Sequence, residues 1–219
     1  MIVNGFFKDY LNDGDEVLLT KAEHASNILP WFNIEKDIKI KYIELDNELV
    51  TLDNVIKSIT PNTKVISLAH ITNVIGDERP IKEITDYAHK HNILVVLDAA
   101  QSAPHVKIDV ENLGVDFMGF SGHKMCGPTG IGVLYGKYEL LNKLNPQNVG
   151  GGMNNDFESN MTYRYKELPY RLEAGTPNIE GVIGLGSAID YINSIGINNI
   201  ENYVSNLRSY AIDKLSKLK

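Results

Sequence analysis

Apolar runs typical of β-strands alternate along this chain with segments that carry a helical apolar pattern. Helical patterns cover residues 52–59 and 81–91, and Pro80 stands at the first turn of the second. The strand-like runs are rich in Val, Ile, Leu and Phe, and they cover residues 17–19, 38–45, 65–68, 93–97, 117–120 and 131–135. Strands that alternate with helices in this way predict an α/β fold with a mostly parallel sheet flanked by helices.

Polar residues follow three of these strand-like runs. His70, Asp98 and the segment Ser121–Lys124 each come just after one of them. In open parallel sheets, ligands bind outside the carboxyl ends of the strands. We therefore expect these polar residues to lie together on one rim of the sheet.

Lys124 and Asp98 indicate a site for pyridoxal phosphate. A lysine that forms an imine with an aldehyde cofactor has to be held on a short, rigid turn, such as Ser121–Lys124. A carboxylate at the end of a buried strand keeps a pyridinium nitrogen protonated, and Asp98 follows the apolar residues 95–97. Burial of that carboxylate without a cationic partner would be costly. The alternatives are a solvated surface lysine and an aspartate that only starts a turn.

Composition limits the class of protein and its partners. The chain has 219 residues, 43% of them hydrophobic and 22% charged, which is typical of a soluble globular protein. The net charge of −7 argues against nucleic acid or an anionic membrane as the main partner. A single cysteine excludes an internal disulfide and fits a reducing compartment. With no signal peptide and no membrane-spanning run in the sequence, we expect a cytoplasmic chain, and we expect no metal site.

Eight segments match one enzyme family in the family's own order. They cover nearly the whole chain and comprise residues 14–18, 23–31, 70–76, 98–105, 116–124, 127–135, 150–152 and 171–178. Each segment alone is a weak signal, whereas their conjunction is specific. The chain resembles the class V, fold-type I pyridoxal phosphate enzymes. Within that family it is similar to the group II cysteine desulfurases of the SufS kind, also called selenocysteine lyases.

The resemblance implies roles for residues around the cofactor. Lys124 would carry the cofactor as an imine and later move protons at the substrate carbon, and Asp98 would bind the pyridinium. His24 would stack on the pyridine ring and assist proton transfer, although an exposed loop histidine is an equal alternative from the sequence. Gln101 would donate a hydrogen bond to the phenolic oxygen of the cofactor. Its ordinary alternative is a polar loop residue.

The remaining implied roles concern the phosphate and the substrate. Ser121 and His123 would bind the phosphate, and Asn73 would lie at the substrate amino acid. Thr176 would reach the phosphate of the neighbouring subunit's cofactor, which implies a homodimer with active sites at the interface. The alternatives are stiffening of the turn by Ser121 and His123, a turn role for Asn73, and a turn or helix N-cap at Thr176.

Cys126 and Arg171 stand near these segments without a clear catalytic role. Cys126 lies two residues from Lys124, where a thiolate would be reactive. The family's sulfur-accepting cysteine comes from a mobile loop far downstream, so we expect Cys126 to be a structural thiol like other buried free cysteines. Arg171 is expected either to order the loop near Thr176 or to form a solvent-exposed salt bridge.

The resemblance also predicts the domain organisation. Residues 1–195 would form the central part of the cofactor-binding large domain, and residues 196–219 the first helix of a small domain, with the boundary near Gly196. The family's enzymes are nearly twice as long, and we expect this chain to be incomplete at both ends. A threonine-containing phosphate loop would precede it. The catalytic cysteine and the arginine that binds the substrate carboxylate would follow it, so residues 1–219 alone are expected to be inactive.

The predicted parent activity is conversion of L-cysteine to L-alanine, with persulfide sulfur passed towards iron–sulfur cluster assembly. The partners would be the amino-acid substrate, L-cysteine or L-selenocysteine, a second subunit and a sulfur-acceptor protein. One alternative is another class V lyase or aminotransferase. The other is a truncated, non-catalytic binding chain.

Overall fold

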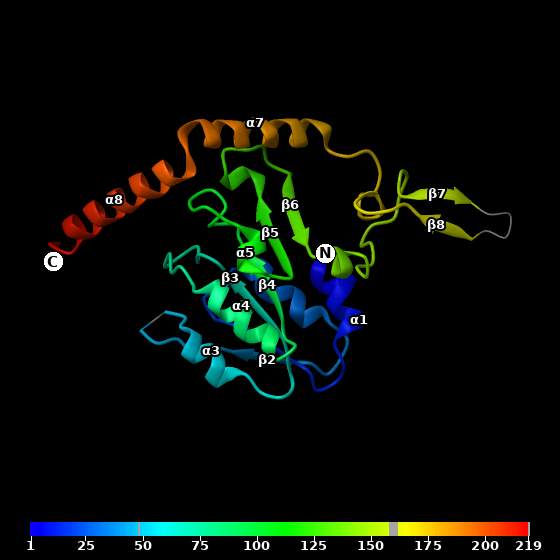
Figure 1. Cartoon of the computed structure of the whole chain (residues 1–219), viewed down its shortest axis with the longest axis horizontal. Coiled ribbons are helices and arrows are strands. Elements are labelled where there is room, and N and C mark those ends of the chain that lie inside the picture. Colours follow the sequence, from blue (N-terminus) through cyan, green and yellow to red (C-terminus); the bar gives the residue numbers. More distant parts are fainter. Residues whose placement is uncertain (48, 158–161, 219) are drawn as a thin grey trace.

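The sheet predicted from the sequence is present. The computed structural model describes residues 1–47, 49–157 and 162–218 (Figure 1). Six strands form one sheet in the order β2-β1-β3-β4-β5-β6, and all neighbours pair in parallel except β5 and β6. The strands are β1 Glu16–Leu19, β2 Lys39–Tyr42, β3 Thr63–Ala69, β4 Leu94–Asp98, β5 Phe117–Ser121 and β6 Gly132–Gly136. The predicted α/β fold with a mostly parallel sheet is therefore confirmed.

The strand order and the length of one connection determine which residues lie at the carboxyl edge of the sheet. The order reverses between β1 and β3, and in open α/β sheets ligands bind at such a switch point. Residues 122–131 connect β5 to β6, which is too short for the crossover that a parallel neighbour needs, so β6 runs antiparallel. Lys124 lies on this short connection, directly beyond the carboxyl end of β5.

Helices and the N-terminal segment cover the two faces of the sheet. Alternate strand residues point to opposite faces, so Ile66 packs in one apolar cluster and Val65 in the other. The helix α4, Ile81–Lys90, buries Ile81 and Ile84 in the first cluster, and Pro80 is the residue that directly precedes its first turn. The other helices are α1 Lys8–Tyr10, α2 Ala25–Ile28, α3 Leu52–Ser58, α5 Val110–Leu113, α6 Tyr138–Leu141, α7 Ile179–Ile195 and α8 Ile197–Leu215.

A strand pair and a helix extend away from the sheet. The strands β7 Asn154–Phe157 and β8 Tyr163–Tyr165 pair antiparallel and project from one side, and α8 projects from the other (Figure 1). Gly196, with φ +88°, separates α7 from α8. No residue of α8 is buried. The helix break lies at the predicted domain boundary, and assignment of α8 to a second domain stays a prediction.

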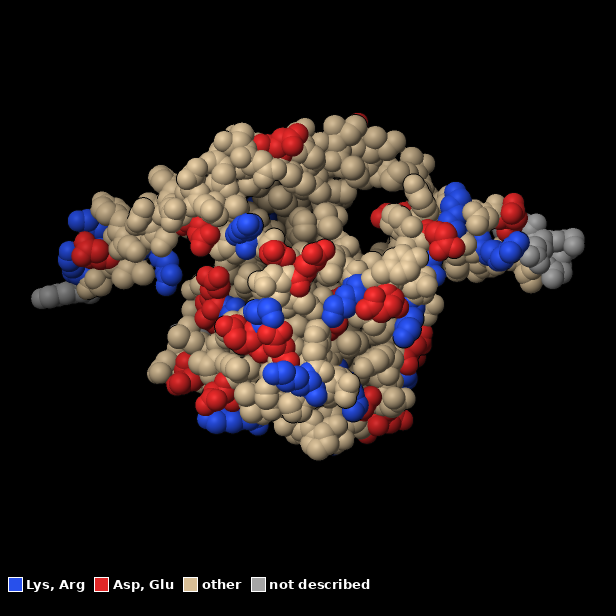
Figure 2. Space-filling model, in the orientation of Figure 1, with Lys and Arg blue, Asp and Glu red and all other residues tan. Residues whose placement is uncertain are grey.

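The surface carries no extended patch of one charge on the face seen in Figure 2. Acidic and basic side chains are intermixed around the sheet, whereas α7 presents mainly uncharged residues. Among them, Val182, Ile183 and Tyr191 are exposed. Within the described residues, no helix has the length and apolar character needed to cross a membrane.

Candidate active site

A cavity of about 650 Å³ lies at the carboxyl edge of the sheet, and it brings together five of the eight predicted site residues. His24 comes from the loop after β1, Asp98 from the end of β4, and the other three from the end of β5 and the turn that follows. These five lining residues are His24, Asp98, Ser121, His123 and Lys124. Residues that follow three different strands therefore converge on one space.

The turn that carries Lys124 is tightly closed. Residues Gly122–Lys124 form a single 3-10 turn, and Gly122 donates its N–H to the carbonyl of Ile131 at 2.9 Å. The N–H groups of Met125 and Gly127 both donate to the carbonyl of Gly122 at 3.0 Å. A Cβ at Gly122 would lie 2.8 Å from Cγ2 of Ile131, and a Cβ at Gly127 would lie 2.8 Å from the Gly122 oxygen. The rigid turn predicted for Lys124 is present and requires both glycines.

Lys124 and Asp98 line the same cavity without pairing with each other. Among the described residues, Lys124 Nζ has no hydrogen-bond or ion-pair partner. Asp98 Oδ1 accepts a hydrogen bond from the N–H of Ala100 at 2.9 Å, which fixes the carboxylate at the end of its strand. The cavity thus presents an amine and, separately, a partly buried carboxylate. This donor set fits a ligand with an aldehyde at one position and a protonated ring nitrogen at another.

His24 is held in place by a contact at the start of α2. It is the N-cap of α2, and its Nδ1 accepts from the N–H of Ser26 at 3.2 Å and lies 3.0 Å from the Ser26 hydroxyl. The residue is exposed, yet it lines the cavity. The cap interaction fixes the imidazole at the cavity wall, while stacking on a cofactor ring stays a prediction.

Three predicted site residues do not line this cavity. Gln101 is partly buried in the turn after Asp98, and Asn73 is exposed in the loop after β3. Thr176 is exposed and follows Gly175, which has φ +79°. The cofactor, substrate and neighbouring-subunit roles of these residues stay predictions.

The prediction that Cys126 is a buried thiol is wrong. Cys126 is exposed, has φ +63° and does not line the cavity. The buried position on this turn belongs to Met125, which packs against Leu185 and Ile192 of α7. The left-handed backbone at residue 126 turns the chain after Met125, and the cysteine is left on the solvent side.

Arg171 orders its surroundings through main-chain contacts. Its Nη2 donates to the carbonyl of Leu141 at 2.9 Å and also to the carbonyl of Asn142. These carbonyls lie at the end of α6, where a cation interacts favourably with the helix terminus. Arg171 forms no ion pair with any described residue.

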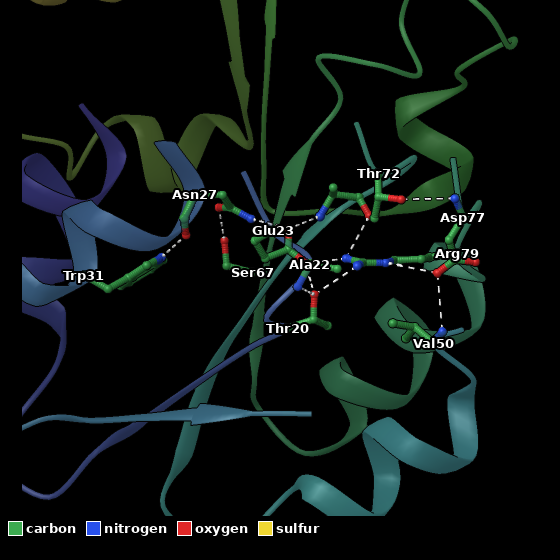
Figure 3. A network of polar contacts seen from close by, with 11 residues as sticks. Thr20, Ala22, Glu23, Asn27, Trp31, Val50, Ser67, Thr72, Asp77 and Arg79 are labelled. Carbon is green, nitrogen blue, oxygen red and sulfur yellow. Dashed lines mark hydrogen bonds and ion pairs between the residues drawn. The ribbon is translucent and has the colours of Figure 1, made fainter. Parts of the chain in front are cut away.

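Two features of the rim were not predicted from the sequence. The first is a buried polar network that joins Glu23 to Arg79 (Figure 3). The second is the burial of His70, a residue that was expected at this rim: it lies buried beside Asp98 and donates its backbone N–H to the Asp98 carbonyl at 2.9 Å. Burial lowers the pKa of the His70 imidazole, and its Nδ1 has no partner among the described residues. The only sequence signal for either feature was the presence of polar residues just after β1 and β3.

The packing of α7 on the turn after Lys124 can be tested with two glycines of that helix. A Cβ at Gly184 would lie 2.5 Å from Cγ of Pro128, whereas a Cβ at Gly186 would meet nothing within 4 Å. Gly184→Ala is expected to destabilise the protein by about 1–3 kcal/mol because the contact is overpacked. Gly186→Ala is expected to stabilise it by about 0.5–1 kcal/mol because alanine favours the helix. Urea unfolding measures both changes, and equal effects would contradict the close packing.

Comparison with known proteins identifies the family of this chain. The aminotransferase class-V family matches residues 1–219. A probable cysteine desulfurase of Halalkalibacterium halodurans is 45% identical over 222 residues, which cover 100% of this chain and 54% of that protein. The crystal structure of the cysteine desulfurase CsdA of Escherichia coli has a TM-score of 0.94 and 36% identity, with 100% of this chain and 55% of that chain covered. The apo structure of a cysteine desulfurase of Thermococcus onnurineus has a TM-score of 0.90 and 36% identity, with coverages of 98% and 55%.

The chain spans about half the length of these relatives. The comparisons confirm the resemblance to class V enzymes that was inferred from the sequence segments, and they confirm the fold. Because the family match extends from the first residue to the last, the chain belongs to the aminotransferase class-V family.

Proposed function

We propose that this chain provides the cofactor-binding part of a pyridoxal phosphate-dependent cysteine desulfurase. The observation that carries the proposal is the cavity in which Lys124 and Asp98 lie without pairing with each other. The names of the relatives, cysteine desulfurases of three organisms, support the choice of reaction within the family.

The residues at the rim fit the parts of pyridoxal phosphate. Asp98 would accept a hydrogen bond from the protonated ring nitrogen, and Ser121 and His123 would bind the phosphate. Gln101 would donate to the phenolic oxygen from the turn after Asp98. Thr176 would reach the phosphate of a neighbouring subunit's cofactor, in line with its exposure outside the cavity. When bound, the cofactor withdraws electrons from the α-carbon of the substrate.

Lys124 and His24 would handle the protons of the reaction. The ε-amine of Lys124 would hold the aldehyde of the cofactor and, once free, would remove the α-proton of the substrate. The closed turn of residues 122–127 keeps this amine in the cavity. His24, fixed by its bond to Ser26, would assist the transfer from the cavity wall.

The substrate would be L-cysteine, with Asn73 in contact with the amino acid. The Cβ–S bond of the substrate breaks, and the sulfur joins an acceptor thiol as a persulfide. A proton takes the place of sulfur at Cβ, and Cα regains the proton that it lost, which gives L-alanine. Cys126 is the sole cysteine of the sequence and lies outside the cavity, so we propose that it is not the acceptor. Residues 1–219 alone would then release no sulfide.

The wider setting of the reaction is part of the same proposal. We infer a cytoplasmic homodimer that passes persulfide sulfur to an acceptor protein for iron–sulfur cluster assembly. The exposure of Thr176 and the intermixed surface charges are compatible with this setting (Figure 2). Selenocysteine as substrate is the competing outcome within the same site.

A labelling experiment tests the proposal. The purified protein is incubated with pyridoxal phosphate, reduced with borohydride and digested, and the pyridoxyl group is expected on the peptide that contains Lys124. In a second sample, L-cysteine in D₂O is expected to exchange its α-proton, which mass spectrometry detects. This exchange does not require the acceptor thiol. A label elsewhere, or cofactor binding without α-proton exchange, would favour the alternative of a non-catalytic binding chain.

A further inference from the structure

A buried ion pair joins the two rim loops that follow β1 and β3. The side chains of Glu23 and Arg79 are both 0% exposed, and Arg79 Nη1 donates to Glu23 Oε1 (Figure 3). Glu23 directly precedes His24, which lines the cavity. Arg79 lies at the end of the loop that contains Asn73. One ion pair thus connects the segments that carry two predicted site residues.

The carboxylate of Glu23 is saturated with donors from three parts of the chain. Its Oε1 accepts from the hydroxyl of Thr20 at 2.7 Å as well as from Arg79. Its Oε2 accepts from Asn27 Nδ2 at 2.9 Å and from the N–H of Ala69, the last residue of β3, at 2.7 Å. These contacts lie on both sides of His24 in the sequence, and they fix its loop to the end of the neighbouring strand.

Arg79 closes the base of the second loop. Its Nη2 donates to the Thr20 hydroxyl at 2.9 Å, and its backbone N–H donates to the carbonyl of His70 at 3.0 Å. Within the loop, Thr72 and Asp77 form two hydrogen bonds, both of 3.1 Å. The N–H of Thr72 donates to the carbonyl of Asp77, and the N–H of Asp77 donates to the hydroxyl of Thr72. Asn73, in the same loop, is exposed.

Stability alone is a weak explanation for this arrangement. The desolvation of two buried charges offsets much of their attraction, and apolar pairs of similar volume often stabilise a fold equally well. An ion pair with every carboxylate position occupied instead defines one geometry for the groups around it. We infer that Glu23 and Arg79 are positioning residues that hold the His24 loop and the Asn73 loop at the cavity rim. The inference rests on the proposed function, in which His24 and Asn73 face cofactor and substrate.

The variants have to separate positioning from folding. Removal of Arg79 alone would leave the Glu23 charge buried without a partner, which is strongly destabilising. The double variant Glu23→Gln/Arg79→Met removes both charges at similar volume, and the glutamine can still accept from Ala69 N–H. Asp77 Oδ2, which lies 3.5 Å from Arg79 Nε, loses that contact but still accepts from the N–H of Val50 at 3.3 Å. Arg79→Lys keeps the charge but cannot reach Glu23 and Thr20 in the same way. Lys137→Met is the matched control.

The control breaks a partly exposed ion pair at the opposite end of the sheet, where Asp116 keeps a second contact, 2.9 Å from its Oδ2 to His89 Nε2. Lys137 Nζ lies 2.7 Å from Asp116 Oδ1, and Asp116 is buried just before β5. If faster hydrogen exchange in the rim loops came only from the loss of any ion pair, Lys137→Met should show it as much as the double variant does.

Hydrogen exchange of the cofactor-free protein is the first readout. In the double variant, amides of residues 20–28 and 70–79 are expected to exchange about tenfold faster, while those of β4 and α4 stay unchanged. Arg79→Lys is expected to give a smaller acceleration, and Lys137→Met none in these loops. Unchanged exchange in both loops, or acceleration spread equally over the whole sheet, would overturn the positioning role.

The visible circular dichroism of the bound cofactor is the second readout. Per mole of cofactor attached at Lys124, the signal is expected to fall in the double variant because the His24 loop no longer fixes one geometry beside the ring. An unchanged signal would overturn the inference even if the loops loosen. Absence of the Lys124 label in the unmodified protein would instead refute the proposed function, and that result is independent of the exchange data.

Discussion

Lys124→Ala is expected to abolish covalent attachment of pyridoxal phosphate and to lower α-proton exchange of L-cysteine by about 10²–10⁴-fold, the range of a lost general base. The reason is the position of the amine. Its turn is closed by the Gly122 carbonyl, which accepts from the N–H groups of Met125 and Gly127. No described residue pairs with Nζ, so the amine is free to react with a ligand in the cavity.

The measurement combines borohydride labelling with exchange in D₂O at saturating cofactor. Lys107→Ala is a matched control, because Lys107 is exposed and outside the cavity. It should leave both readouts unchanged. Full labelling of Lys124→Ala at another lysine would mean that the turn of residues 122–127 has a structural role and that the central assignment is wrong.

The sheet and its rim could be predicted from the sequence because both depend on local patterns. Parallel strands that are buried on both faces have continuous apolar sequences, which are easily recognised. The strands β4 and β5 accordingly lie within two residues of their predicted bounds. The carboxyl ends of parallel strands share one edge, so Asp98 and Lys124 were expected to lie together without knowledge of the strand order. Their shared cavity confirms that expectation.

The polar network at the rim could not be predicted in the same way. Glu23 and Arg79 are 56 residues apart, and a charged residue is exposed in most proteins. Their burial follows from the adjacency of β1 and β3, which is a property of the strand order rather than of either segment. The exposure of Cys126 was missed for a related reason. A small apolar thiol favours burial, whereas the backbone conformation at that one residue decides the outcome.

Residues with roles outside one cavity are the hardest to assign. Thr176 is exposed, and its predicted ligand would belong to a second subunit. No pattern within one chain specifies that contact. Gln101 follows Asp98 by three residues, yet only Asp98 and Ala100 of that turn line the cavity. The direction of a side chain in an irregular turn depends on contacts that sequence periodicity does not encode.

Asp98→Asn is expected to retain cofactor labelling at Lys124 but to lower α-proton exchange by about 10²–10³-fold, comparable to the loss of one preorganised electrostatic group. Asparagine keeps the shape of the side chain and can still accept the hydrogen bond from Ala100 N–H. The substitution therefore removes the negative charge with little change in the turn. Without that charge, a ring nitrogen bound beside residue 98 loses its preference for the protonated form, and the ring withdraws electrons less strongly.

Two comparisons make this prediction specific. Asp109→Asn is the matched control, because Asp109 is an exposed N-cap of α5 and asparagine caps helices equally well. It should change neither labelling nor exchange. Asp98→Ala removes the charge and also the bond to Ala100, so its exchange rate should fall at least as far as that of Asp98→Asn. Near-normal exchange in Asp98→Asn, together with a loss confined to Asp98→Ala, would mean that the carboxylate serves only the turn and not the cofactor.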